Sequence, residues 1–93
     1  MANWKITKDR FAAEIEGRSA VGVGSVGIDQ IDEKTLTEKF RLLDDDGVIY
    51  FDGVSDDSTS QNAFDPLDDF GQLDSGCTEI QYFNKETRRY ETL

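Results

Sequence analysis

The side chains with the most scope for chemistry in this sequence are carboxylates. Residues 42–77 contain ten aspartates and no lysine, arginine or glutamate. Carboxylate oxygens can bind a hard cation, and a suitably spaced pair can exchange protons during hydrolysis. A dense set can also attract a basic protein or imitate the phosphates of nucleic acid. The ten are Asp44, Asp45, Asp46, Asp52, Asp56, Asp57, Asp65, Asp68, Asp69 and Asp74.

A metal site would need several of these carboxylates around one centre. An EF-hand calcium loop has glycine at its sixth position, an acid at its first and glutamate at its twelfth. If Gly47 is the sixth position, Leu42 is the first and Gly53 the twelfth, so the motif fails. No cofactor is predicted, and an irregular metal site remains only as a minor alternative. Its ligands would be Asp44, Asp46, Asp52 and Asp56.

Catalysis has few candidates. The sequence has no histidine, which removes the usual proton-transfer group near neutral pH and the Ser-His and Cys-His nucleophile pairs. Asp68 and Asp69 could serve acid-base hydrolysis, which requires a raised pKa and a defined separation. Adjacency in sequence supplies neither. No catalytic residue is therefore predicted, and a small hydrolase ranks third among the functional hypotheses.

A glycine-rich stretch, GVGSVG at residues 22–27, has the G-x-G-x-x-G spacing of a dinucleotide-binding turn. In that motif the glycines join a strand to a helix that binds the pyrophosphate. Residues 28–32 do not begin a convincing helix, and 93 residues cannot hold a two-lobed nucleotide fold. We therefore expect these glycines to mark a strand bend or a close approach of another backbone.

Size and charge restrict the class of protein. The chain of 93 residues predicts one domain, residues 1–93, with a small core. The lone Cys77 cannot form an intramolecular disulfide, and neither a secretion signal nor an apolar membrane span is visible, so we expect a cytoplasmic protein. The net charge of −10 disfavours direct binding to nucleic acid or to an anionic membrane.

The strongest structural signal is a β-hairpin at residues 39–53, where Asp46-Gly47 separates two apolar runs. One face should form core, and the other is too apolar to lie fully in water, so we expect another segment over it. The core face carries Phe40, Leu42, Ile49 and Phe51, and the other carries Arg41, Leu43, Val48 and Tyr50.

A second hairpin is predicted at residues 78–93, with its turn at 84–87. An odd number of loop residues would place Tyr90 and Thr92 on the face of Ile80 and Tyr82, so we expect three or five. Trp4 and Ile6 alternate with polar neighbours, which predicts a short strand near the N-terminus.

Residues 54–76 are rich in turn formers but contain the spaced apolar anchors Phe64, Leu67, Phe70 and Leu73. A loop of this length inside a compact domain is commonly functional or partly disordered. We expect residues 64–74 to form an ordered lid held by Phe64, Leu67 and Phe70, and residues 54–62 to be mobile.

Together these signals predict a mainly β fold. We expect a small antiparallel sheet or partly open barrel of four or five strands, with two hairpins and at most one short helix at residues 9–16 or 32–39. An α+β fold is the alternative if residues 31–40, IDEKTLTEKF, are helical.

Four stretches resemble a group of short, uncharacterised bacterial proteins. They are WKITKD, FRLLDDDGVIYFDG, FDPLDDFG and GCTEIQYFNKETRRYETL, and together they cover roughly half the chain. Residues 17–37 depart from the pattern of that group. The resemblance implies no activity, cofactor or catalytic residue.

Acidic loops can serve solubility alone, but we expect a non-enzymatic binding module whose acidic loop surface meets a protein with a basic surface. The alternative is a nucleic-acid mimic that inhibits a DNA- or RNA-handling protein. An exposed edge strand would also allow a homodimer. The candidate contact residues are Asp44, Asp45, Asp46, Asp65, Asp68, Asp69 and the aromatic Phe70.

Overall fold

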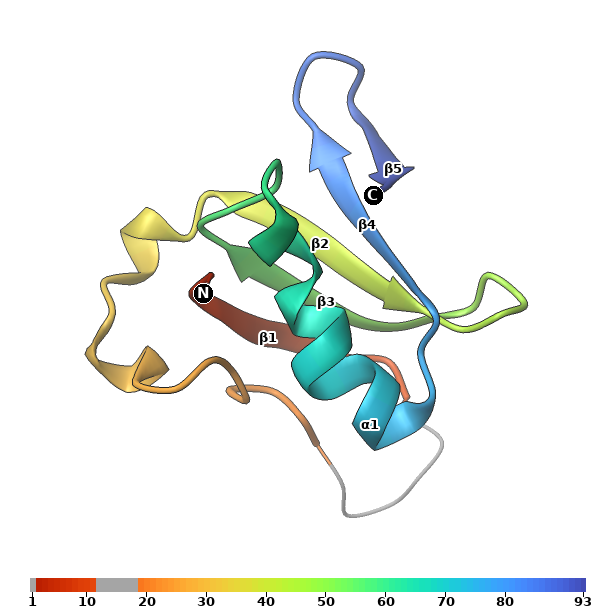
Figure 1. The fold of residues 1–93 in the computed structure, drawn as a ribbon, viewed down its shortest axis with the longest axis horizontal. Helices are drawn as coiled ribbons and strands as arrows, with labels where there is room; N and C mark the ends of the chain where they lie inside the picture. The colour runs from red at the N-terminus through yellow and green to blue at the C-terminus, as the bar shows by residue number, and fades with distance from the viewer. Residues whose placement is uncertain (1, 12–18) are drawn as a thin grey trace.

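The computed structural model describes residues 2–11 and 19–93, and its centre is an antiparallel sheet. Five strands in this part of the chain take the order β1-β3-β2-β4-β5 (Figure 1). The predicted mainly β fold with two hairpins is confirmed, and the sheet is open, not a barrel. The strands are β1 (Trp4–Asp9), β2 (Glu38–Leu43), β3 (Ile49–Ser55), β4 (Glu79–Asn84) and β5 (Arg89–Thr92).

A helical segment, residues 61–75, packs on one face of the sheet, in front of β2 and β3 in Figure 1. The Ser60 hydroxyl caps its start by accepting a hydrogen bond from the amide of Asn62, and Gly76 ends it with a left-handed φ of 70°. The predicted ordered lid is thus a helix. It comprises η4 (Gln61–Phe64), the π-helical η5 (Leu67–Gly71) and α1 (Gln72–Ser75).

The helix expected at residues 9–16 or 32–39 is not found in the described part of the chain. Residues 12–16 lie outside the described residues, and residue 9 belongs to β1. Within residues 32–39 only the 3₁₀ turn η3 (Glu33–Thr35) is helical, because β2 begins at residue 38 and draws the chain into the sheet. The α+β alternative, which needed a helix there, is therefore wrong.

The core lies between the helical segment and the sheet. Phe70 joins the two layers, since its ring centroid lies 5.0 Å from that of Phe51 and 6.0 Å from that of Trp4. The hydroxyl of Tyr82 donates a hydrogen bond of 2.8 Å to the carbonyl of Ala63, which adds a polar link. The buried side chains in this layer include Trp4, Ile6, Phe40, Leu42, Phe51, Ala63, Leu67, Ile80 and Tyr82.

The first hairpin largely follows its prediction. Phe40, Leu42 and Phe51 are buried as expected, whereas Ile49 is half-buried because the strand pairing shifts beside it, between residues 42 and 43. The expectation that the other four residues are covered holds in part. Leu43 is buried, and Tyr50 packs against Phe11 with ring centroids 4.7 Å apart. Arg41 is half-buried, whereas Val48 is exposed.

The second hairpin corrects the predicted loop parity. Asn84 pairs with Arg89, which leaves a four-residue loop, so the expected three or five residues were wrong. The Asn84 side-chain carbonyl accepts hydrogen bonds from the amides of residues 86 and 87, and Arg88 takes a left-handed φ of 57°. As a result Tyr90 pairs with Phe83, and Glu91 comes opposite Tyr82.

The GVGSVG stretch runs along the outer edge of β1. The amide of Ile6 donates to the carbonyl of Val23 at 2.7 Å, and the amide of Ser25 donates to the carbonyl of Trp4 at 3.0 Å. A β-carbon on Gly24 would lie 2.3 Å from that Trp4 oxygen. The close backbone approach expected of these glycines is confirmed at Gly24.

Residues predicted to be mobile, 54–62, have defined positions. Ser55 is fully buried at the end of β3, and residues 61 and 62 begin the helical segment. The carboxylate of Asp57 accepts hydrogen bonds from the amides of Thr59 and Ser60, at 3.0 and 2.9 Å, and shapes the intervening turn. The turn-forming residues here lead into the N-terminus of the helical segment, which Ser60 caps.

Replacing Gly53 tests the packing at the centre of the sheet. A β-carbon there would lie 2.3 Å from Cζ of Phe40 and 2.6 Å from the carbonyl oxygen of Lys5. We expect Gly53→Ala to lower the free energy of unfolding by about 1 to 3 kcal/mol, measured by urea denaturation, because the backbone oxygen cannot rotate away. Gly22→Ala is a comparison that gives the cost of backbone strain alone, since its φ is +94° but nothing lies within 4 Å of its β-carbon position. A loss below about 1 kcal/mol for Gly53→Ala would contradict the tight contact.

Candidate functional site

The hairpin turn at residues 44–46 uses one of its three aspartates for structure. Asp44 Oδ1 accepts hydrogen bonds from the amides of Asp46 and Val48, both at 2.9 Å. The amide of Val48, followed by that of Asp46, holds the pKa of Asp44 below its usual value. Asp45 and Asp46 are exposed at the turn. The first carboxylate therefore closes the hairpin, while the other two face solvent.

The other predicted carboxylates lie on the helical segment. Asp65 is half-buried and its Oδ2 accepts a hydrogen bond of 2.8 Å from the amide of Ala2, whereas Asp68 and Asp69 are exposed. Although Asp69 is exposed as a residue, its carboxylate loses some hydration to the neighbouring protein surface, which raises its pKa, and the negative charges of Asp65 and Asp68 raise it further. These three carboxylates are therefore close enough to repel one another.

The apolar anchors of the helical segment are only partly as predicted. Leu67 is buried and Phe70 packs on the aromatic core, so these two hold the segment to the sheet. Phe64 and Leu73 are instead 37% and 80% exposed, which corrects their expected role as anchors. Phe70, expected at a partner contact, is largely occupied by the core. The outer side of the segment thus combines carboxylates with apolar side chains.

The hairpin turn and the end of the helical segment both lie near Cys77. Burial raises the pKa of the Cys77 thiol to about 12, and the charges of Asp44 and Asp74 contribute. The amide of Thr78 also donates to the carbonyl of Leu43 at 2.9 Å, which ties the start of β4 to the end of β2. We refer below to the acidic surface, which comprises residues 44–46 together with Asp65, Asp68, Asp69 and Asp74.

The carboxylates of the suggested metal site do not come together. Asp52 Oδ2 accepts a hydrogen bond of 2.6 Å from Nε of Arg10, and its Oδ1 lies 3.6 Å from Nε of Arg41. Asp56 accepts two hydrogen bonds of 3.0 Å from Asn3. Strand β3 separates Asp56 from Asp44 and Asp46 in the turn. Within residues 2–11 and 19–93, no group of three or more potential ligands could hold a metal ion.

A hollow that the sequence did not predict lies between the β4-β5 hairpin and the residues before η4. Its volume is about 420 Å³, and we call it the hairpin pocket. Among the described residues its lining has apolar walls, three glutamates and one lysine. The residues that line it include Glu38, Ser58, Thr59, Tyr82, Phe83, Lys85, Glu86, Glu91 and Leu93.

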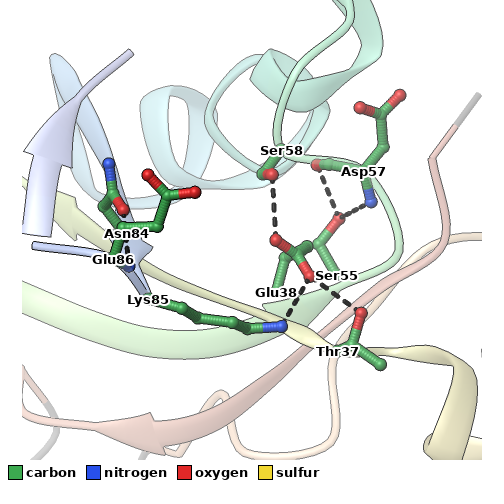
Figure 2. A network of polar contacts seen from close by, with 8 residues as sticks. All are labelled: Thr37, Glu38, Ser55, Asp57, Ser58, Asn84, Lys85 and Glu86. Atoms are coloured by element: carbon green, nitrogen blue, oxygen red, sulfur yellow. Dashed lines mark hydrogen bonds and ion pairs between the residues drawn. The ribbon is translucent and has the colours of Figure 1, made fainter. Parts of the chain in front are cut away.

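Glu38 is the centre of the polar contacts in this pocket (Figure 2). Its carboxylate accepts hydrogen bonds from the hydroxyl of Thr37 at 2.8 Å and from the hydroxyl of Ser58 at 3.0 Å. The ammonium of Lys85 lies 3.3 Å away, reaching across from the β4-β5 loop. The Thr37 hydroxyl, with smaller effects from Ser58 and Lys85, lowers the pKa of Glu38. The carboxylate is therefore held ionised and oriented.

Both walls of the hairpin pocket are braced by further hydrogen bonds. On one side, the hydroxyl of Ser55 donates to the carbonyl of Asp57 and accepts from its amide, both at 3.2 Å (Figure 2). On the other, the Asn84 side chain donates to Oε1 of Glu91 at 3.0 Å. The pocket is thus built between two braced turns.

The chemistry available in this arrangement is binding of a cation. An effective general base has a pKa near the working pH, whereas the pKa of Glu38 is shifted downwards. Burial raises the pKa of the Tyr82 phenol, so this group stays protonated near neutral pH. A fixed, ionised carboxylate beside an apolar wall that includes Tyr82 and Leu93 is suited to hold an ammonium or guanidinium group.

Comparisons with protein-family models, with curated proteins and with solved structures each gave no match. The resemblance to short bacterial proteins therefore stays a prediction. In the part of the chain that the structure describes, no helix is long and apolar enough to cross a membrane.

The Glu38 network predicts a pH-dependent contribution to stability. Because the folded state lowers the pKa of Glu38, its stabilisation is present above the ordinary glutamate pKa and is lost as pH falls through the lowered value. We expect Glu38→Gln to reduce the free energy of unfolding by about 1 kcal/mol at pH 7. In urea titrations the difference from wild type should shrink as pH falls below the ordinary glutamate pKa and through the lowered value. The exposed Glu86 provides the charge-matched control, Glu86→Gln. A difference that stays constant with pH would contradict the role of the ionised form.

Proposed function

We propose that this protein is a non-enzymatic binding module whose acidic surface docks on a basic region of another protein. The observation that carries the proposal is the crowding of Asp65, Asp68 and Asp69, which stand three and four residues apart on the helical segment with Asp68 and Asp69 exposed. Lysine or arginine side chains of a partner would relieve this repulsion. Opposite charges on two proteins also accelerate their encounter and help to select the partner.

The apolar side chains on the same segment support a contact surface over a purely solubilising one. Leu73 is 80% exposed on an ordered element, and Phe64 is 37% exposed. Burial of such apolar groups at an interface contributes to binding because it removes apolar area from water. The carboxylates would then set the association rate, and these two side chains the contact area.

The ordering of the segment also favours binding. Its Leu67 and Phe70 are fixed in the core, and Ser60 and Gly76 define its ends. A surface that already has its bound shape does not lose backbone entropy when the partner arrives. The acidic surface is therefore prepared for docking without a folding step.

Charge removal from the centre of the acidic surface tests the proposal. The double variant Asp68→Asn/Asp69→Asn keeps the shape of the helical segment but removes two exposed charges. We expect affinity capture from the cells that make this protein to recover basic proteins with wild type and to lose them with the variant. For a purified partner, Kd should rise between about twofold and thirtyfold, since each exposed ion pair contributes about 0.2 to 1 kcal/mol. This loss should diminish at high salt.

The matched control neutralises two carboxylates outside the acidic surface, Asp29→Asn/Glu33→Gln, both of which are exposed. Equal losses in the two double variants would mean that net charge alone matters and would refute a defined contact surface. Release of the captured protein by duplex DNA or RNA at constant salt would favour the nucleic-acid mimic over the general binding module.

A further inference from the structure

We propose that the hairpin pocket receives one lysine or arginine side chain of the basic partner, and that Lys85 holds this position in the free protein. The inference rests on the proposed function, because it assigns a specific subsite to the same interaction. It rests on the cavity, on the hydrogen bonds of Glu38 and on the long, exposed ion pair between Lys85 and Glu38.

The shape and lining of the hairpin pocket suit a long cationic side chain. Its volume of about 420 Å³ exceeds what a single side chain fills, and Tyr82 and Leu93 supply apolar parts of its wall. Lysine and arginine place their methylene groups against apolar surface while their charged ends stay with polar partners. Apolar wall and carboxylate are both present here.

Glu38 supplies a prepared counter-ion. The hydroxyls of Thr37 and Ser58 hold its two oxygens, which fixes the direction of the carboxylate before any partner binds. Oriented carboxylates form stronger hydrogen bonds to ammonium and guanidinium groups than neutral acceptors do. Glu86 and Glu91 add negative charge to the lining.

Lys85 shows where a cation is accepted. Its Nζ lies 3.3 Å from Oε2 of Glu38, longer than a close charge-assisted hydrogen bond, and its side chain is 63% exposed. Such exposed ion pairs are weak, so an incoming cation can displace Lys85 at little cost. After displacement, the lysine can swing into water from the tip of the β4-β5 loop.

The hairpin pocket and the acidic surface lie on the same side of the sheet. Tyr82 pairs with Phe40 and with Glu91, so these three side chains point to the face that the helical segment covers. Ser58 and Thr59 line the pocket and lead directly into η4. A partner seated on the helical segment can therefore extend one cationic side chain into the pocket.

Titration of ¹⁵N-labelled protein with Nα-acetyl-lysine methylamide tests the subsite by NMR. The neutral Nα-acetyl-norleucine methylamide has nearly the same shape without the charge. We expect the lysine probe, and not the neutral one, to shift the amides of Ser58, Asn84 and Lys85. Lys85→Met should strengthen binding of the probe about two- to fivefold, because no internal cation must be displaced. Glu38→Gln should weaken binding at least about threefold.

The charge-matched control is Lys34→Met, an exposed lysine on η3, which should change the affinity for the probe by less than about twofold. Probe-induced shifts confined to the amides of residues 65–74, or equal effects of Lys85→Met and Lys34→Met, would overturn the subsite. Those results would leave the proposed function intact, since capture of the partner depends on Asp68 and Asp69. Lysine-specific shifts at the pocket without any captured basic protein would instead count against the proposed function alone.

Discussion

The packing of the helical segment on one face of the sheet is the contact on which the rest of the structure depends. Phe70 lies among the core aromatics and Tyr82 binds the carbonyl of Ala63. A chain of 93 residues can bury only a small core, so few other contacts can replace this layer. The same packing turns Asp68 and Asp69 outward and places Ser58 at the wall of the hairpin pocket.

The negative charge of residues 42–77 is handled in two different ways. Asp44 and Asp57 accept hydrogen bonds from backbone amides and define turns, which is the chemistry expected of aspartate in loops. Asp52 is paired with Arg10, which follows β1, and with Arg41 on β2. The charges of the helical segment lie on its outer side instead. Part of the acidity is thus structural, and the remainder forms a surface.

The sequence predicted the elements whose signals are local. Asp46-Gly47 located the first hairpin, and alternation identified Phe40, Leu42 and Phe51 as core. The order of residues 64–74 was predicted, but their helical conformation was missed because aspartate, glycine and proline are weak helix formers, and tertiary packing overrides their preferences. The hairpin pocket was missed because Glu38, Ser58 and Lys85 meet only through the fold. A prediction of the four-residue loop in the second hairpin would have placed Glu91 beside Tyr82, which would have indicated part of the pocket lining.

The burial of Cys77 gives the molecule an internal reporter of its own opening. The sequence contains one cysteine, and its side chain is fully buried where α1 leads into β4. The amide of Cys77 donates to the carbonyl of Gly71 at 3.0 Å, so the thiol is tied to the helical segment. Thiol reagents require an accessible thiolate. The rate at which they modify this chain therefore measures how often the segment lifts from the sheet, without any introduced label.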